Sequence, residues 1–451
     1  MELLEQIKNA GIVGCGGAGF PTHVKLNCKG KVDTLIVNGA ECEPLLRTDR
    51  WLMRHRASEI VTAAGLCGDA VGAGRVYIAL KEHYTQAVEA LSEAIRAQNS
   101  RVELFRLQNF YPAGDEQALV LEVTGRTVPP AGIPLDAGAV VSNAATMSAI
   151  YDAVQGEAFT QKYLTVTGEV ANPTILRVPI GTPLMECVEA AGGTSLRDYR
   201  ILCGGPMMGK LYTKEEAQQQ VVTKTTSGVT VLPADIPLVE QREMPLRVIL
   251  RRAKTSCIQC SRCTEMCPRH LSGHPLQPHM IMRKLAYAED VSTILDDKDV
   301  RQAQICSQCG VCEVYACPMG LQPRQVNIYV KDELAKAGMR YARTGDSWQP
   351  MEAREWRKAP SRRMAVRLGV GKYYDYEIDT LLTPEVSRVR LPLKQHIGAP
   401  AVPEVKAGDT VTLGQRIASC PEGAMGTNLS ASISGVVTAV DDAITIERGN
   451  V

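Results

Sequence analysis

The sequence predicts a multidomain protein that combines α/β and α+β architectures. Three observations support this fold class. Strands and helices alternate over the first 150 or so residues, two cysteine runs lie between helical segments, and short strands joined by glycine turns fill roughly the last eighty residues. A chain of 451 residues has room for about two to four domains, each with its own core.

The first predicted domain, residues 1–158, has the alternating pattern of a parallel sheet covered by helices. Its expected elements are helices at 3–10, 50–67 and 83–98 and strands at 33–37, 75–80 and 139–141. Asp115 and Glu116 open a further helix, where acidic side chains are favourable. Asn143 follows the last strand, where it or the preceding serine is placed to cap the next helix.

The second predicted domain, residues 159–212, has a strand–strand–helix pattern. Residues 163–170 alternate as a strand, 174–178 form its expected partner, and 183–191 form a helix that ends at a glycine pair. This order predicts a small β-grasp domain.

The remaining sequence divides into four segments. Residues 213–245 are rich in Thr and Val and are interpreted as a connecting segment. Residues 246–340 contain the helical segments that frame the cysteine runs, and the arginine-rich residues 341–385 are predicted to be a solvated linker. Residues 386–451 predict a small barrel-sandwich β domain of the biotinyl-carrier type. No lysine stands at a tight turn there, so a carrier role is not expected.

Composition excludes several classes of partner. The net charge of +1 gives no global field toward nucleic acid or anionic membranes. No stretch of about 18 apolar residues predicts a membrane span, and the polar start of the chain lacks a signal-peptide core. We therefore expect a soluble, cytoplasmic protein with reduced thiols.

Two tandem cysteine runs are the strongest functional signal in the chain. The first has the spacing C-x2-C-x2-C-x3-C and the second C-x2-C-x2-C-x4-C, and each ends in Cys-Pro. Their members are Cys257, Cys260, Cys263, Cys267, Cys306, Cys309, Cys312 and Cys317. Such runs hold 4Fe–4S clusters, and in two-cluster ferredoxins the fourth cysteine of each run ligates the other cluster. The spacing predicts two 4Fe–4S clusters, with Cys267 and Cys317 exchanged between them.

Zinc and disulfides are the rival interpretations of these cysteines. Structural zinc usually takes two spaced pairs around one ion, which fits two sets of four poorly. Disulfides require an oxidising compartment, and nothing in the sequence indicates export.

A glycine-dense loop lies near the start of the chain, with glycines at positions 14, 16, 17 and 19. Such a loop lets the backbone lie flat against a planar or phosphorylated ligand. It fits neither the dinucleotide fingerprint nor a P-loop. Physical reasoning alone leaves a nucleotide cofactor and a structural turn both open.

Four ordered motifs over the first domain resemble the flavoprotein subunit of respiratory complex I. They are the glycine loop with Phe20 and Lys25, the turn around Asn38, Glu41 and Glu43, the turn at Gly114, Asp115 and Glu116, and Asn143 with Thr146. The predicted β-grasp domain is similar to the domain that follows in that family.

The whole chain is more similar to the C subunit of the Rnf electron-transport complex, which adds two ferredoxin-like clusters. Residues 392–400 and the β domain after them resemble the amino-terminal domain of that subunit, but here they stand at the carboxyl end. That order resembles the cobalamin reductases of propanediol-utilisation bacterial microcompartments, over essentially the full length.

The resemblance implies a set of FMN-binding residues: Gly14, Gly16, Gly17, Gly19, Lys25, Asn38, Glu41, Gly114, Asp115 and Asn143. In that family Lys25 would meet the phosphate, and Asn38 with Glu41 the ribityl chain or ring edge. Phe20, Glu43 and Glu116 fall where complex I contacts NADH.

Other NADH contacts of complex I are missing. Cys28 stands where an aromatic side chain would stack on adenine, and Val128 and Ala131 replace a lysine and a phenylalanine. The resemblance therefore implies NADH binding that is weaker or differently arranged.

The implied activity is an NADH-dependent cobalamin reductase that needs no acid–base dyad or nucleophile. A flavin takes two electrons and releases them singly, so electrons would pass from NADH through FMN and two 4Fe–4S clusters to cobalamin. The implied partners are a corrinoid adenosyltransferase and microcompartment shell proteins. An Rnf-type subunit that feeds a membrane complex, and a non-enzymatic shell-associated electron conduit, are the alternatives.

Overall fold

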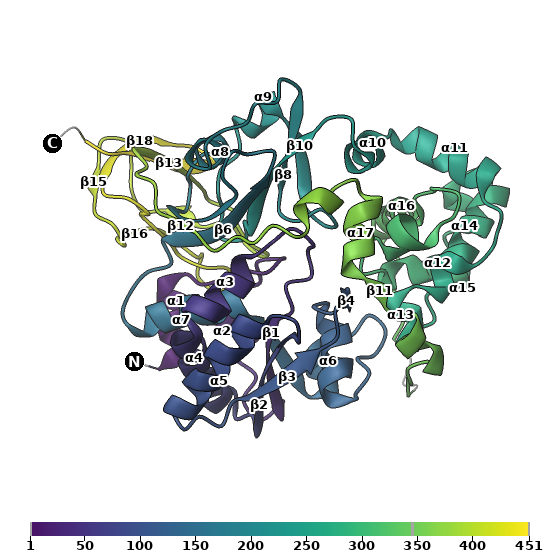
Figure 1. Cartoon of the computed structure of the whole chain (residues 1–451), viewed down its shortest axis with the longest axis horizontal. Helices are drawn as coiled ribbons and strands as arrows, with labels where there is room; N and C mark the ends of the chain where they lie inside the picture. The colour runs from purple at the N-terminus through teal and green to yellow at the C-terminus, as the bar shows by residue number, and fades with distance from the viewer. Residues whose placement is uncertain (1, 344–346, 450–451) are drawn as a thin grey trace.

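The computed structural model describes residues 2–343 and 347–449. The amino-terminal α/β domain lies at the lower left of Figure 1, the second domain above it, and the helical cysteine domain to the right. The carboxyl-terminal β domain, in yellow, packs beside the first two domains although it is last in the sequence.

The first domain is built on a parallel four-stranded sheet with the order β3-β2-β1-β5. Its strands are β1 (Thr34–Gly39), β2 (Arg75–Lys81), β3 (Glu103–Leu107) and β5 (Ala139–Asn143). One face packs against α1 (Leu3–Ala10), α3 (Thr48–His55), α4 (Ala57–Val71), α5 (Thr85–Ala97) and α7 (Ala144–Val154). The other face packs against α6 (Glu116–Thr124). The prediction of a parallel sheet is confirmed.

The helix predicted at 50–67 is divided in two. Arg56 separates α3 from α4 with a non-helical φ of −128°. Its guanidinium pairs with Asp152 at 2.6 Å and donates to Ser148 at 2.8 Å, both on α7. These tertiary contacts fix the break, and the local sequence carries no sign of it.

The second domain has a six-stranded sheet with the order β12-β7-β6-β10-β8-β9. The strands are β6 (Gln161–Gly168), β7 (Thr174–Pro179), β8 (Tyr199–Cys203), β9 (Lys210–Thr213), β10 (Gly228–Pro233) and β12 (Leu381–Leu382), with helix α8 (Leu184–Ala190) beside them. The sheet extends beyond the predicted boundary at residue 212, because β10 lies between β6 and β8. Short helices α9 (Lys214–Ala217) and α10 (Pro237–Glu243) also lie in the connecting segment.

The cysteine domain packs three helices around one core: α11 (Leu246–Ser256), α14 (Pro278–Tyr287) and α16 (Pro323–Lys336). Short helical turns α12 (Arg262–Glu265), α13 (Pro268–Leu271), α15 (Lys298–Arg301) and η4 (Cys312–Ala316) carry or flank the cysteine runs.

The segment predicted to be a solvated linker is packed only in part: residues 359–373 contain buried side chains, whereas Trp356 is 86% exposed, and residues 344–346 lie outside the described residues. Strand β11 (Ala359–Pro360) pairs with β4 (Phe110–Tyr111) of the first domain. Helix α17 (Ser361–Arg367) follows, and Met364 and Tyr373 are buried. Apolar side chains between the arginines bind this segment to the other domains.

The carboxyl-terminal domain consists of two small antiparallel sheets. One contains β13 (Arg388–Pro392), β19 (Ala443–Glu447), β18 (Gly435–Val440) and β15 (Thr410–Val411), and the other β14 (Val402–Pro403), β16 (Arg416–Ser419) and β17 (Leu429–Ser430). The loop of this domain that contains Ile397 contacts the first domain, where Ile397 N donates to the carbonyl of Gly19 at 3.3 Å. No helix among the described residues is long and apolar enough to cross a bilayer.

Candidate functional site

A large hollow opens where the parallel strands β1 and β5 end. Asn38 and Asn143 are register partners at the carboxyl ends of these strands, and both line it. The hollow measures about 1010 Å³, part of it open to solvent. The carboxyl edge of a parallel sheet is where α/β proteins bind ligands.

The glycine loop forms one wall of this hollow. Gly16 packs so closely on Asn143 that a Cβ would lie 2.9 Å from its Cγ. A Cβ on Gly17 would meet no described atom within 4 Å, although Gly17 lines the hollow. The loop therefore presents bare backbone to open space, which fits a flat cofactor such as FMN.

The other two glycines of the loop, Gly14 and Gly19, do not line the hollow but fix the shape of the loop. Gly14 N donates to the carbonyl of Phe20 at 2.9 Å. Gly19 has a φ of 67° and lies against His396 of the carboxyl-terminal domain. The carboxyl-terminal domain thus supports the loop from behind.

The second turn is joined to the third by hydrogen bonds. Asn38 Nδ2 donates to the carbonyl of Gly114 at 2.8 Å, and its Oδ1 accepts from Ala40 N at 3.1 Å. Gly114 N donates to Cys42 Sγ at 2.6 Å. These bonds bring two of the motifs implied by the resemblance into one wall.

Two carboxylates, the buried Glu41 and the partly buried Asp49, line the hollow. Glu41 accepts from Asp49 N at 2.8 Å at the start of α3, and Asp49 accepts from Asn143 Nδ2 at 2.7 Å. Burial, reinforced by the charge of Glu41, raises the pKa of Asp49 to about 7. Burial also raises the pKa of Glu41.

Of the three side chains assigned to NADH by resemblance, the two glutamates are engaged within the protein. Glu43 lines the hollow, and its two carboxylate oxygens accept from Met207 N and Met208 N at 2.8 Å each. Glu116 pairs with Lys25 at 2.5 Å. Lys25, Glu116 and Phe20 are not among the residues that line the hollow.

Asp115 joins the first domain to the cysteine domain. Its carboxylate caps α6 by accepting from Gln117 N and Ala118 N at 3.2 and 3.1 Å. It also accepts two bonds from Arg269, at 2.6 and 2.9 Å. Because Arg269 stands two residues after Cys267, this pair ties one wall of the hollow to the cysteine runs.

The two cysteine loops have left-handed residues at the same two positions. Gln259 and Gln308 occupy equivalent positions and have φ values of 53° and 59°. The next equivalent pair, Ser261 and Gly310, has φ values of 60° and 84°. Left-handed residues turn successive N–H groups inward, and such concave turns bind anionic groups, including iron–sulfur centres.

Each run places its fourth cysteine next to the other run. Cys263 interacts with Cys257, Cys260 and also Cys317, whereas Cys267 interacts with Cys309 and Cys306. Burial, followed by the neighbouring thiols, raises the pKa of Cys263 to about 12. Burial raises the pKa of Cys267 as well.

A π-helical turn accommodates the longer spacing of the second run. Cys312–Ala316 form this turn, which Cys317 N closes by donating to the carbonyl of Cys312 at 3.1 Å. The buried pair Arg324–Glu313, at 2.6 Å, fastens the turn to α16. Single π turns are frequent at functional sites, and this one absorbs the extra residue.

Among the described residues, no three His, Cys, Asp or Glu side chains are grouped to hold a single metal ion. A 4Fe–4S cluster has a different requirement, since each thiolate binds a separate iron. Backbone and amide donors already point at the sulfurs: Gln308 N and Asn327 Nδ2 at Cys306, 3.4 and 3.6 Å away.

The hollow and the second cysteine run share a wall. Ser307 and Cys309 line the hollow. Tyr111, which also lines it, donates from its hydroxyl to the carbonyl of Cys309 at 2.8 Å. A cofactor in the hollow would therefore border the second run directly.

Sequence reasoning missed lining residues contributed by α3 and by the second domain. They are Thr48, Asp49, Lys162, Met208 and Ser227. Lys162 offered a signal, because it shares strand parity with the apolar Leu164 and Val166, and lysine is rarely buried without a partner. Ser227 lies in the Thr- and Val-rich segment and offered none.

Four family models match successive parts of the chain. They are the Nuo51 FMN-binding domain at residues 7–152, the SLBB domain at 163–211, the 4Fe–4S dicluster domain at 256–322 and the RnfC barrel sandwich hybrid domain at 372–451. The predicted fold classes of the flavin, β-grasp, cysteine and barrel-sandwich domains are confirmed.

A full-length relative decides the family. The cobalamin reductase PduS of Salmonella typhimurium is 41% identical and covers 99% of this chain and 97% of its own. The chain belongs to the PduS cobalamin reductase family. The C subunit of the Na(+)-translocating ferredoxin:NAD(+) oxidoreductase complex of Acetobacterium woodii is 37% identical over 59% of this chain and 58% of its own. A solved NAD+-reducing [NiFe]-hydrogenase aligns with 20% identity over 75% of this chain and 62% of its own, with a TM-score of 0.47.

The PduS family assignment and the domain matches identify an oxidoreductase with flavin and iron–sulfur domains. The structure brings the residues of both kinds of domain to one place. The predictions of an FMN-binding domain and of an iron–sulfur domain are therefore confirmed.

Proposed function

We propose that the protein transfers electrons from NADH, through FMN and two 4Fe–4S clusters, to cobalamin. The shared wall between the hollow and Cys309 carries this proposal. When bound, FMN accepts two electrons from a nicotinamide and gives them up singly. The residues of the chain hold the cofactors, exclude water and tune potentials.

The FMN-binding residues proposed on the structure are those that line the hollow. Gly16 and Gly17 offer a flat backbone surface, Asn38 and Asn143 offer amides at the strand ends, and Gly114 closes the opposite wall. Glu41 and Asp115 border the hollow with carboxylates that already accept hydrogen bonds. Lys25 would need to leave Glu116 to reach a phosphate.

We propose that the two clusters exchange their fourth ligands. Cys257, Cys260, Cys263 and Cys317 form one set, and Cys306, Cys309, Cys312 and Cys267 the other. The thiol neighbours of Cys263 and Cys267 support this assignment. Hydrogen bonds to the sulfurs of Cys306 and Cys317 lie within reach to adjust cluster potentials.

The first set is proposed as the electron outlet. Cys260 is exposed, and Ile258 and Met319 beside it are 60% and 42% exposed. The second set is nearer the hollow, and none of its four cysteines is exposed. Electrons would enter at the flavin and leave at the exposed set.

The donor and acceptor are proposed from relatives. The Acetobacterium woodii relative is a subunit of a ferredoxin:NAD(+) oxidoreductase, and the Salmonella typhimurium relative is a cobalamin reductase. We further propose a cytoplasmic location inside a bacterial microcompartment, with a corrinoid adenosyltransferase and shell proteins as partners.

Anaerobic reduction of cob(III)alamin by NADH tests this function. The purified protein is expected to contain one FMN and about eight irons, as two 4Fe–4S clusters require. NADH should bleach its visible spectrum and form cob(II)alamin, and Cys→Ala changes in either cysteine set should stop cobalamin reduction. Bleaching without cobalamin reduction would overturn the acceptor, and absence of bleaching would overturn the donor.

A further inference from the structure

The hollow assigned to the flavin is rich in carboxylates. Its lining includes Glu41, Glu43, Asp49 and Asp115. FMN brings a phosphate, and its ring gains negative charge on reduction. A cavity that binds such a cofactor needs a cation to offset these charges.

Lys162 is the one lysine or arginine among the described residues that line this hollow. It comes from β6 of the second domain and is 3% exposed. Its charge acts on Asp49, which accepts a hydrogen bond from Asn143. Lys162 therefore lines the hollow close enough to Asp49 for its charge to act on that carboxylate.

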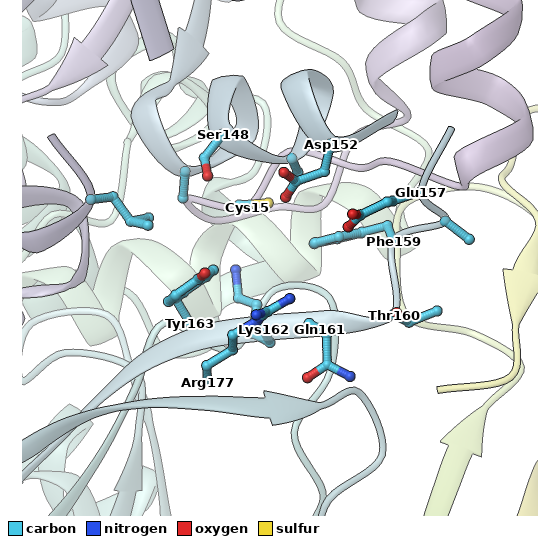
Figure 2. A pocket seen from close by; sticks show the side chains of 14 residues that line it. Cys15, Ser148, Asp152, Glu157, Phe159, Thr160, Gln161, Lys162, Tyr163 and Arg177 are labelled. Carbon is cyan, nitrogen blue, oxygen red and sulfur yellow. The ribbon is translucent and has the colours of Figure 1, made fainter. Parts of the chain in front are cut away.

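A smaller cavity of about 520 Å³, partly open, continues from the hollow, and the two share Cys15, Ala145 and Lys162. Figure 2 shows Lys162 on the strand side of this cavity, with Cys15 and the helix bearing Asp152 opposite. Asp152 is held by Arg56 at 2.6 Å. Lys162 thus stands at the junction of the two cavities.

The other carboxylates around the hollow already have donors. Glu43 accepts from two backbone N–H groups, Asp115 accepts from Arg269, and Glu41 accepts from the start of α3. These contacts offset their charge within the protein. Among the described residues that line the hollow, Lys162 is therefore the cation available to pair with an anionic group of the cofactor.

We propose that Lys162 binds an anionic group of the flavin, so that the second domain completes the cofactor site. This inference rests on the proposed function. A charge-assisted hydrogen bond in a buried site makes binding about 10- to 100-fold tighter. If the group is the ring, the bond strengthens on reduction. Each tenfold tighter binding of reduced flavin relative to oxidised flavin then raises the two-electron potential by about 30 mV.

Flavin binding to the deflavinated full-length protein tests the proposal. Fluorescence quenching gives the Kd for FMN and for riboflavin, and a spectroelectrochemical titration of the reloaded protein gives the flavin potential. The variants are Lys162→Met and Lys162→Arg. Arg177→Met is the matched control, because Arg177 is the neighbouring cation on β7 and lines only the smaller cavity. Iron content and circular dichroism report the fold of each variant.

The expected result is weaker FMN binding by Lys162→Met, about tenfold or more, with binding largely retained by Lys162→Arg and Arg177→Met. Loss of FMN affinity with unchanged riboflavin affinity assigns the contact to the phosphate. Loss of both affinities with a lower potential assigns it to the ring. Unchanged affinities and potential, or an equal loss in Arg177→Met, overturn the proposal. Failure of the wild-type protein to bind FMN would refute the proposed function instead.

Discussion

Removing Arg269 tests whether the buried ion pair with Asp115 holds the flavin domain against the cysteine domain. The side chains are 8% and 17% exposed, and two hydrogen bonds of 2.6 and 2.9 Å join them. Arg269→Met leaves a buried carboxylate without its cation, which costs about 3–5 kcal/mol. The measurement is equilibrium urea unfolding of the anaerobic holoprotein, followed by tryptophan fluorescence.

The matched control is Arg301→Met. Arg301 pairs with Asp296 at the same 2.6 Å, but these side chains are 38% and 84% exposed. An exposed pair contributes about 0–1 kcal/mol. If Arg269→Met lost no more stability than Arg301→Met, burial of the Asp115 pair would not govern its contribution, and the reasoning would be refuted.

The pH dependence gives a second readout of the same pair. Burial acts to raise the pKa of Asp115, but the charge and hydrogen bonds of Arg269, with those from Ala118 N and Gln117 N, hold it below its ordinary value. A lowered carboxyl pKa stabilises the fold above the unfolded pKa of about 3.9, and that stability is lost as pH falls through the folded pKa. Without Arg269 the pKa of Asp115 rises, so the deficit of the variant should shrink as pH is lowered from about 7 toward 4.

Two further predictions follow from the loops. Gly17→Val should leave the fold and iron content intact, because a Cβ there meets no described atom within 4 Å. It should weaken FMN binding, measured by fluorescence quenching, because Gly17 lines the hollow and the valine adds bulk to the flat backbone surface. Unchanged affinity would place the cofactor elsewhere. If the fourth ligands are exchanged, Cys317→Ser should remove the electron paramagnetic resonance signal of the exposed set. Cys267→Ser should then remove the signal of the set beside the hollow. The reverse pattern would show that each run holds its own cluster.

The sequence predicted what local patterns encode. The two iron–sulfur cysteine runs and the parallel strands of the first domain follow from local patterns, whereas lining residues such as Asn38 and Asn143 came from motifs that resemble the complex I flavoprotein subunit. The break at Arg56 depends on Asp152, and the place of β10 depends on strands far away in the chain. Non-local contacts of this kind leave little trace in neighbouring residues.

The site was also incomplete from sequence because another domain supplies part of it. Lys162 reaches the hollow from β6, and the loop at Met207 and Met208 occupies the carboxylate of Glu43. The sequence identified the glycine loop and the cysteine runs separately. That the hollow beside the loop shares a wall with the second run at Cys309 is seen only in the folded chain.

The passage of electrons from the hollow into the second cysteine set is the central claim, and a single-turnover measurement tests it most directly. Reduced nicotinamide is mixed anaerobically with wild-type protein and with Cys309→Ala in a stopped-flow spectrophotometer, with cob(III)alamin present. We predict that both proteins show flavin bleaching, but that only the wild type goes on to form cob(II)alamin. Formation of cob(II)alamin by Cys309→Ala at the wild-type rate would contradict the account.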